Sequence, residues 1–368
     1  MKGKHRAARY LSALLVIALT AALWALPLQS AADASATLNE TLGRHERAVW
    51  SLDFARLLGR EKQSAAGKML IPGGQAVGVA IHTQGVVVVG TSDGAGLEAG
   101  LRAGDVLLSI NGRPLDSADI LTETVNAAAG QPLSIELTRG GKQQTVLASP
   151  RFDESSRTWR LGVWVRDSTA GVGTLTFYDP ATGGYGALGH AITDSDTGLM
   201  LPVREGDLMD AAIVSVRRGQ RGMPGELKGS FLREQIGLGS VRKNSAAGIF
   251  GRMEKAPENA LYPAGLPVGG KTDVHTGEAT ILSTVDGKNM VEYTVEITQV
   301  NRGNEQKSLV LHVTDARLLE KTGGIVQGMS GSPIIQDGKI IGAVTHVFVN
   351  DPARGYGIFI ENMLDAAS

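Results

Sequence analysis

The second half of the sequence is made of short apolar segments separated by glycine and aspartate turns, and this pattern restricts the fold more than any other feature. From about residue 151 onward, "RLGVWVRD", "GVGTLTFYDP", "SLVLHVTD" and "KIIGAVTHVFV" have the length and composition of β-strands. In "ATILSTVDGKNMVEYTVEITQV" two such segments flank Asp286-Gly287, which predicts a hairpin. Because glycine is frequent, with 48 residues, and helical patterns are few, we expect a mainly β protein with an antiparallel barrel or sandwich.

Composition excludes several kinds of site. A chain of 368 residues is long enough for two domains with separate cores. The net charge of −1 gives no global attraction to nucleic acid, so no nucleic-acid partner is expected. Cysteine is absent, which excludes disulfides, a cysteine nucleophile and a thiolate zinc site. The histidines are scattered without a His-x-x-x-His pair, so we expect no metal and no other cofactor.

The N-terminus carries the pattern of a targeting segment. Basic residues in "MKGKHRAARY" precede the uncharged stretch "LSALLVIALTAALWALPL", and small residues follow in "SAADASA". We therefore expect residues 1–30 to be a signal peptide or a retained membrane anchor, with the rest of the chain outside the cytoplasm. The alternative is a buried helix of a soluble domain. Residues 31–67 read as a polar, partly helical connector, whose exposure would make it sensitive to proteolysis.

Residues 68–149 have the order of elements of a small peptide-binding module. "GGQAVGVAIHTQGVVVVG" predicts paired strands, "SADILTETVNAAAG" predicts a helix with Ser117 as N-cap, and "LSIELTRGGKQQTVLA" predicts a hairpin. Together with "AGLRAGD" and "INGRPL", this order resembles a PDZ domain of the bacterial protease type. A PDZ domain adds a peptide to a strand edge and holds its C-terminal carboxylate on backbone amides. We expect Gly74, Gly78 and Val79 to lie nearest such a peptide, unless these residues only form a turn.

The segment "GIVQGMSGSPII" places one serine inside a glycine-rich turn that leads into an apolar strand. Gly328 and Gly331 allow the backbone to bend around Ser330, so that the N–H groups of Gly328 and Ser330 can converge on one oxyanion. Ser330 is therefore a candidate nucleophile. The alternative is that it is only a small residue in a tight turn. Ser332 is a weaker candidate because Pro333 and a strand follow it.

A nucleophilic serine needs an imidazole base and a group that orients the imidazole. His190 lies in the glycine-rich loop "GGYGALGHAITDSDTG", where site residues are more common than in strands, and His346 is its rival on the strand after the serine loop. Asp315 ends "SLVLHVTD" on the inward face of that strand, where a buried carboxylate needs a partner such as an imidazole. Asp194 and Asp196 read as turn residues, although either could orient His190 instead.

Over most of the chain from residue 68, these motifs resemble the stage IV sporulation protein B peptidase family. The resemblance rests on "YGALGHAITDSDTG", "QGMSGSP", the PDZ-like segment and the apolar N-terminus. It implies a trypsin-like antiparallel β-barrel peptidase domain over residues 150–368. It also implies a catalytic triad of His190, Asp315 and Ser330. The order His, Asp, Ser matches chymotrypsin, but fifteen residues between aspartate and serine is a short interval for that larger family.

The resemblance further implies a function in endospore formation. A family member is a membrane-associated serine endopeptidase that cuts a membrane-anchored regulatory protein between mother cell and forespore, which activates late sigma-factor processing, and it also cuts itself. Two alternatives remain. The chain is a non-enzymatic PDZ adaptor, or it is a quality-control protease, in which the protease domain normally precedes the PDZ domain.

Overall fold

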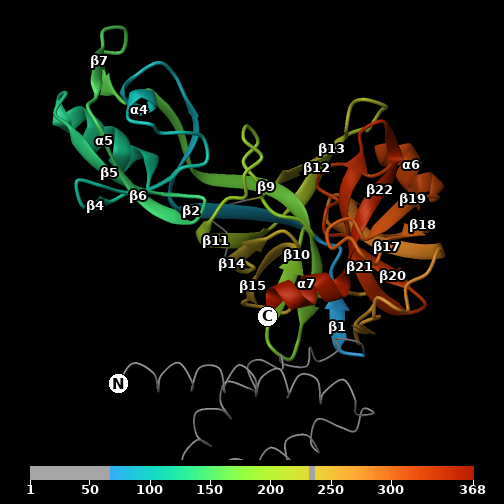
Figure 1. Ribbon diagram of the computed structural model, residues 1–368. Helices are drawn as coiled ribbons and strands as arrows, with labels where there is room; N and C mark the ends of the chain where they lie inside the picture. The colour runs from blue at the N-terminus through green and yellow to red at the C-terminus, as the bar shows by residue number, and fades with distance from the viewer. Residues whose placement is uncertain (1–66, 232–236) are drawn as a thin grey trace, which may run out of the picture. The chain divides into compact units, whose positions relative to one another are not determined.

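The computed structural model of the protein describes residues 67–231 and 237–368 (Figure 1). The expected targeting segment, residues 1–30, and all of the expected connector except Gly67 lie outside the described residues. Within the described ranges, no helix is both long and apolar enough to cross a membrane. Strands dominate these ranges, so the predicted mainly β fold is confirmed.

Six antiparallel strands close into a first barrel. They are β2 (Ala76–Thr91), β9 (Val163–Asp179), β10 (Gly184–Ala187), β15 (Gly248–Met253), β14 (Gly239–Ser245) and β11 (Val203–Asp210). The ring runs in the order β9-β10-β15-β14-β11-β2, and pairing of β2 with β9 from Ala76↔Thr174 to His82↔Ser168 closes it. Alternate residues of β2, Val77, Val79 and Ile81, are buried inside, as the two-residue period of a strand requires.

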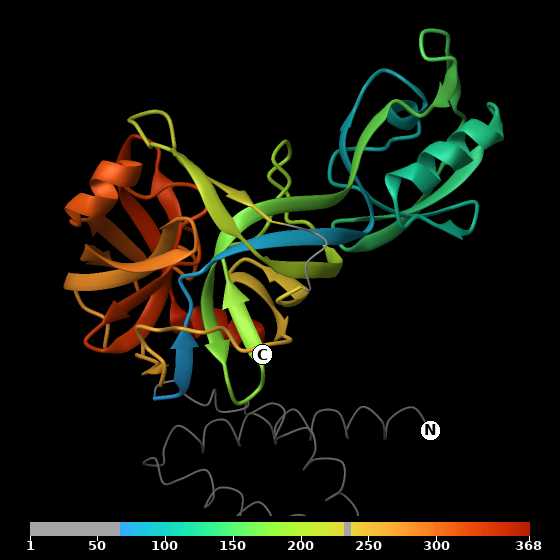
Figure 2. The same cartoon turned by 180° about the vertical axis from the view of Figure 1, so that it is seen from behind.

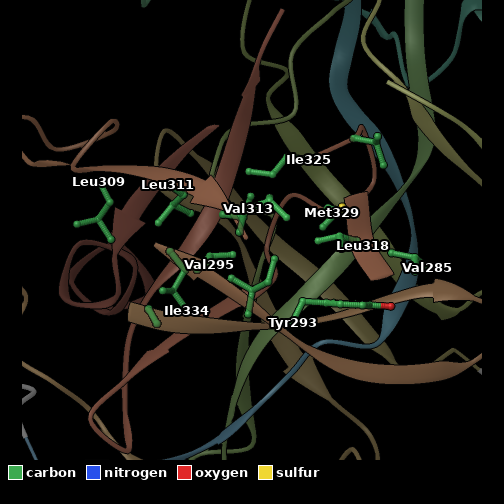
Figure 3. Close-up of a cluster of buried hydrophobic side chains, with 14 of the residues drawn as sticks. Val285, Tyr293, Val295, Leu309, Leu311, Val313, Leu318, Ile325, Met329 and Ile334 are labelled. Atoms are coloured by element: carbon green, nitrogen blue, oxygen red, sulfur yellow. The ribbon is translucent and has the colours of Figure 1, made fainter. Parts of the chain in front are cut away.

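A second barrel follows in the sequence. Its strands are β17 (Gly277–Asp286), β18 (Asn289–Val300), β19 (Leu309–Val313), β22 (Asp351–Phe359), β21 (Lys339–Phe348) and β20 (Pro333–Gln336), in that order around the ring. The predicted hairpin is confirmed: β17 and β18 pair from Gly277↔Ile297 to Asp286↔Asn289. Tyr293 and Val295 face a core that also holds Met329 and Ile334 (Figure 3). Ile297 is buried in the same core. Helix α6 (Ala316–Thr322) joins β19 to the segment that contains Ser330.

The PDZ-like part forms a third core. It contains α4 (Ala95–Glu98), β3 (Val106–Ile110), β4 (Arg113–Pro114), α5 (Ala118–Ala128), β5 (Leu133–Arg139) and β6 (Lys142–Ala148). Ser117 caps α5 as predicted, because its hydroxyl accepts the Ile120 N–H at 3.3 Å. Leu121 and Val125 are the buried residues of α5, and the left-handed Ala129 ends the helix.

Two long strands belong to both the first barrel and the PDZ-like core. β2 has 16 residues and β9 has 17, and Figures 1 and 2 show them running side by side. The first half of β2 lies in the barrel, whereas Val86 and Val88 are buried in the PDZ-like core together with Leu161. The PDZ-like core therefore starts later than residue 68 and takes in residues after 149, unlike the expected continuous domain.

Two of the three residues expected to hold a peptide, Gly78 and Val79, lie in a strand of the first barrel, and Gly74 lies just before that strand. Gly78 and Val79 sit in the part of β2 that is paired on both sides, with β9 and with β11. Gly74 donates its N–H to Leu175 O, and a Cβ there would come within 2.7 Å of Leu282. The expectation for Gly74, Gly78 and Val79 is wrong in this structure, because no edge is left beside them for a peptide to join.

The remaining elements extend these cores. They are β1 (Met69–Pro72), β7 (Arg151–Asp153), β8 (Thr158–Arg160), β12 (Ala212–Arg217), β13 (Glu226–Ser230), β16 (Leu266–Pro267) and α7 (Ile360–Ala367). β1 pairs with β9 and β16, while β7 with β8 and β12 with β13 form separate two-stranded sheets. Ile360 and Met363 of α7 are buried in a cluster that also contains Phe250 of the first barrel and Ile358 of the second.

Candidate active site

The loop that carries Ser330 is held in place by contacts with both barrels. Met329, the residue before Ser330, is fully buried in the core of the second barrel (Figure 3). On the side, Thr174 of β9 donates its N–H to Ser330 O at 3.0 Å and its hydroxyl to Gly328 O at 2.8 Å. Gly331 has a φ of +98°, and a Cβ there would lie 2.1 Å from Thr174 O. Glycine is required at this position because the loop turns while touching the first barrel.

Two backbone donors in this loop have no acceptor among the described residues. The N–H groups of Met329, Gly331 and Ser332 donate to Val326 O, Val344 O and Met329 O, respectively. The N–H groups of Gly328 and Ser330 make no hydrogen bond within residues 67–231 and 237–368. Unpaired backbone donors are uncommon in folded proteins, and two of them beside a candidate nucleophile can stabilise an oxyanion.

His190 follows β10 through two residues with positive φ, Leu188 at +69° and Gly189 at +70°. A Cβ on Gly189 would lie 3.0 Å from the Thr345 side chain, so this turn brings His190 against the second barrel. The His190 Nδ1 lies 2.8 Å from Ala191 O. Because a carbonyl oxygen only accepts, the neutral ring carries its proton on Nδ1 and leaves the Nε2 lone pair free for use as a base.

One pocket of about 400 Å³ contains both predicted groups. Its lining includes His190 from the first barrel and Gly328, Ser330 and His346 from the second. The rings of His190 and His346 lie 4.8 Å apart between centroids. The Ser330 hydroxyl donates to Thr345 O at 2.6 Å. The structure therefore brings Ser330, His190 and the two free N–H groups to one place, from elements far apart in the sequence.

Desolvation lowers the pKa of both imidazole rings. Burial lowers the pKa of His190, against a smaller raising effect of its hydrogen bond to Ala191 O. His346 keeps an exposed edge, but desolvation, followed by the nearby His190 and Lys307, lowers its pKa to about 4. Both imidazoles are consequently neutral at pH 7. His346, the rival candidate for the base, thus lies in the same pocket as His190.

Asp315 is buried, as its position in the sequence predicted, but its partners are not the predicted ones. It is the N-cap of α6, accepting the backbone N–H groups of Arg317 and Leu318. Its second oxygen accepts the Arg317 guanidinium at 2.7 Å and the Thr294 N–H at 3.3 Å. The structure does not bring Asp315 to His190, because both carboxylate oxygens are engaged at the start of α6. An aspartate directly before "ARLLEKT" is a helix N-cap signal, and it could have been recognised as one.

The Arg317 guanidinium and the backbone donors hold the pKa of Asp315 at about 2, below its usual value. A carboxyl whose folded pKa is depressed adds stability above its unfolded pKa of about 4, and this stability is lost as pH falls toward 2. We expect Asp315→Asn to lower the free energy of unfolding by roughly 1–2 kcal/mol at pH 7. The deficit should shrink as pH falls below about 4, which urea unfolding at several pH values measures.

The same variant also tests the expected triad. If Asp315 acts only as a cap, peptide cleavage by folded Asp315→Asn stays within about tenfold of wild type, whereas loss of an orienting aspartate in a triad costs about 10⁴-fold. A loss of that size in folded protein would contradict the cap role and restore Asp315 as the group that orients His190.

The two other carboxylates near His190 are turn residues, as expected. Asp194 accepts the N–H groups of Asp196 and Thr197 and forms an ion pair with Arg166 at 2.7 Å. Asp196 is exposed and pairs with the same Arg166. In the part of the chain that the structure describes, no three His, Asp or Glu side chains gather in a group that could hold a metal ion.

Comparisons with known proteins match two regions of the chain. The family model "SpoIVB peptidase S55" matches residues 157–364, and a PDZ domain model matches residues 74–148. The zinc metalloprotease RasP of Geobacillus kaustophilus is 35% identical over 60 residues, which are 16% of this chain and 14% of the relative. The putative zinc metalloprotease LL2128 of Lactococcus lactis is 31% identical over 96 residues, which are 26% of this chain and 20% of the relative. The matches therefore span no more than a fifth of these relatives.

Solved structures show only weak similarity. The active form of the Rv3671c protease from M. tuberculosis has a TM-score of 0.31 at 12% identity, covering 54% of this chain and 73% of the other. The PDZ domain of the SdrC-like protein from Listeria monocytogenes has a TM-score of 0.21 at 21% identity, covering 22% of this chain and 87% of the other.

The S55 family model spans more than half of the 368 residues, and the PDZ domain model matches a separate region that precedes it. The chain therefore belongs to the SpoIVB peptidase S55 family and contains a region that matches a PDZ domain.

Proposed function

We propose that the protein is an endopeptidase in which Ser330 is the nucleophile and His190 the general base. The observation that carries this proposal is the shared pocket, where Ser330, His190 and two backbone donors without acceptors meet. A serine is activated when a neutral imidazole can take its proton, and the acyl intermediate forms when nearby donors stabilise the oxyanion. His190 comes from a part of the chain far from the serine loop, and a structural turn alone does not require a histidine beside it.

The reaction begins with rotation of the Ser330 hydroxyl away from Thr345 O toward His190 Nε2. The oxygen attacks the peptide carbonyl while Nε2 takes the proton, and the N–H groups of Gly328 and Ser330 stabilise the resulting oxyanion. His190 then gives the proton to the leaving amine, and an acyl–Ser330 ester remains. A water molecule, deprotonated by His190, hydrolyses that ester and restores the serine. The carbonyl of Ala191 stays on Nδ1–H and holds the ring in its basic tautomer throughout.

The acid limb of the pH profile tests His190 as the base. Because only the neutral ring accepts a proton, kcat/KM rises as pH rises through the pKa of the free enzyme's His190. Burial lowers that pKa, so the half-maximum of the rise is expected below pH 6.5. Initial rates on a quenched fluorescent peptide between pH 4 and 9 measure it. A midpoint above 6.5 would indicate an acidic partner at the ring and would overturn this arrangement.

We propose a regulatory substrate rather than unfolded protein in general. Membership of the S55 family supports a membrane-anchored regulator of late sigma-factor processing during sporulation, and the basic and apolar N-terminus supports a place outside the cytoplasm. Self-cleavage within the connector, residues 31–67, belongs to the same proposal. N-terminal sequencing of the purified full chain, compared with Ser330→Ala, tests self-cleavage. Extensive degradation of denatured casein would favour a quality-control protease instead.

The PDZ-like core is proposed to bind an extended peptide. The match of residues 74–148 to a PDZ domain supports this binding, and the corrected position of Gly74, Gly78 and Val79 moves the peptide away from them. Calorimetric titration of Ser330→Ala with peptides that end in a free carboxylate measures the interaction without cleavage.

A further inference from the structure

The pocket that holds the candidate nucleophile and base is lined mainly by apolar side chains. The first barrel contributes Val172 and Leu188, and the second contributes Ile325 and Val347. Among the lining residues that the structure describes, none is Asp, Glu, Lys or Arg, and the only titratable side chains are the two histidines. Lys307, which lowers the pKa of one of these histidines, is not a lining residue. A substrate side chain that enters this pocket therefore meets no charge of opposite sign.

The oxyanion donors determine which part of the pocket receives the residue before the cut bond. Ser330 attacks the carbonyl of that residue, and the N–H groups of Gly328 and Ser330 bind its oxygen. The residue therefore lies against the segment 325–328, which leads into the serine loop. Residues 345–347 of β21 line the same pocket, and the Ser330 hydroxyl donates to Thr345 O at 2.6 Å. The side chain before the cut consequently enters between the segment 325–328 and β21.

Ile325 forms the floor of this space. Its backbone N–H donates to Pro352 O at 2.8 Å, and its side chain lies in the core of the second barrel (Figure 3). A Cβ on Gly355 of β22 would lie 2.6 Å from Ile325 Cδ1, so the isoleucine occupies room that β22 leaves only because it has a glycine there. Because Ile325 lines the pocket and also contacts β22, an incoming side chain meets Ile325 before it can reach that strand.

Val347 narrows the same space from β21. It is half-buried, packs against the core that contains Ile325, and pairs with Gly355. Two branched aliphatic side chains therefore surround the place where the substrate side chain enters. Another aliphatic side chain gains apolar contacts there. An ionised side chain loses its water without gaining a partner, and a large ring meets the floor.

We propose that this pocket selects substrates with alanine, valine or leucine immediately before the cut bond, and that Ile325 sets the size limit. One methylene more or less in a hydrophobic pocket changes selectivity by about 10- to 200-fold. The preference should therefore be strong against large aromatic residues, and stronger still against Lys, Arg, Asp and Glu. The substrate class is a protein that exposes an extended aliphatic segment rather than a basic or acidic one. This inference rests on the proposed endopeptidase function.

A peptide library tests the preference with the unmodified protein. The full chain is incubated with proteome-derived peptides, and the residue before each cut is identified by mass spectrometry. We expect alanine, valine and leucine to be enriched over their frequency in the library, and the four ionised residue types to be depleted at least tenfold. Frequencies equal to those of the library, or enrichment of a charged or aromatic residue, would overturn the proposed selection.

A conservative variant tests Ile325 as the floor. Ile325→Val removes one methylene from the pocket, and Ile334→Val makes the same change at a buried residue of the same barrel outside the lining. The substrates are two versions of the best-cut library peptide, with valine or phenylalanine before the cut. We expect the ratio of kcat/KM for phenylalanine over valine to rise at least threefold in Ile325→Val and to keep its wild-type value in Ile334→Val. A general loss of activity cancels in this ratio.

The remaining outcomes are equally decisive. Equal ratios in the two folded variants contradict the role of Ile325, and if Ile325→Val does not fold, the library result decides. Absence of both cleavage and fluorophosphonate labelling of Ser330 in the wild-type chain overturns the endopeptidase function, and with it this inference. Labelling and cleavage without an aliphatic preference leave the endopeptidase function intact and overturn the proposed selection alone.

Discussion

Replacement of Ser330 with alanine is expected to abolish peptide cleavage, with a loss of roughly 10⁴- to 10⁶-fold in kcat. The side chain loses the oxygen that forms the acyl ester, whereas the loop keeps its shape because Met329 remains buried and Thr174 still bonds to the backbone of residue 330. A fluorophosphonate should label the Ser330 hydroxyl of the wild-type chain and leave the variant unlabelled. Melting temperature should change little, because the hydroxyl makes a single hydrogen bond, to Thr345 O.

Ser332 offers a matched control two residues away. Its hydroxyl is fully buried and bonds to Ser283 at 3.1 Å, so Ser332→Ala removes a serine from the same loop without touching the pocket. This variant should cost about 1 kcal/mol of stability and keep its cleavage activity. Undiminished cleavage by Ser330→Ala would defeat this mechanism, whereas absence of both cleavage and labelling in the wild-type chain would favour a non-enzymatic PDZ adaptor.

Gly331→Ala is expected to be among the most damaging single changes in the second barrel. Its φ of +98° lies in a region that alanine rarely occupies, and the added methyl would lie 2.1 Å from Thr174 O and 2.5 Å from Leu188 N. Strain and overpacking each cost about 1–3 kcal/mol, so the free energy of unfolding should fall by roughly 2–5 kcal/mol. Because the contact is with β9, the loop must shift away from it, and activity should fall at least 100-fold even in the folded fraction. Chemical unfolding and labelling kinetics give the two quantities.

Gly338 provides the comparison, since it also has a positive φ, +70°, but a Cβ there meets nothing within 4 Å. Gly338→Ala should therefore cost about 1 kcal/mol, from backbone strain alone, and leave cleavage unchanged. If Gly331→Ala were no more destabilising than Gly338→Ala, the close packing of the serine loop on β9 would be incorrect.

Local patterns predicted the features that depend on neighbouring residues. The Asp286-Gly287 hairpin and the Ser117 cap follow from spacing and turn chemistry, and both are present. Ser330 and His190 were identified because a glycine-rich loop tolerates the backbone angles that a site needs, and the structure brings these two into one pocket.

Features that depend on contacts between residues far apart in the sequence could not be predicted from local patterns. Alternation correctly turned Asp315 inward, but it could not reveal that α6 and Arg317, rather than His190, satisfy the carboxylate. In the same way, "AVGVAIHTQGVVVVG" was interpreted as strands of one small domain, because its residues do not indicate that the first half pairs with β9 on one side and β11 on the other.

The sharing of β2 and β9 between two cores has a mechanical consequence. Each of the two strands contributes side chains to two different hydrophobic cores, so the backbone of β2 and of β9 joins the PDZ-like core covalently to the first barrel. We therefore expect the PDZ-like core and the first barrel to unfold in a single cooperative transition on heating. For the same reason the PDZ-like core cannot be excised as residues 68–149, because the cut would remove β2, one of the six strands on which the first barrel closes.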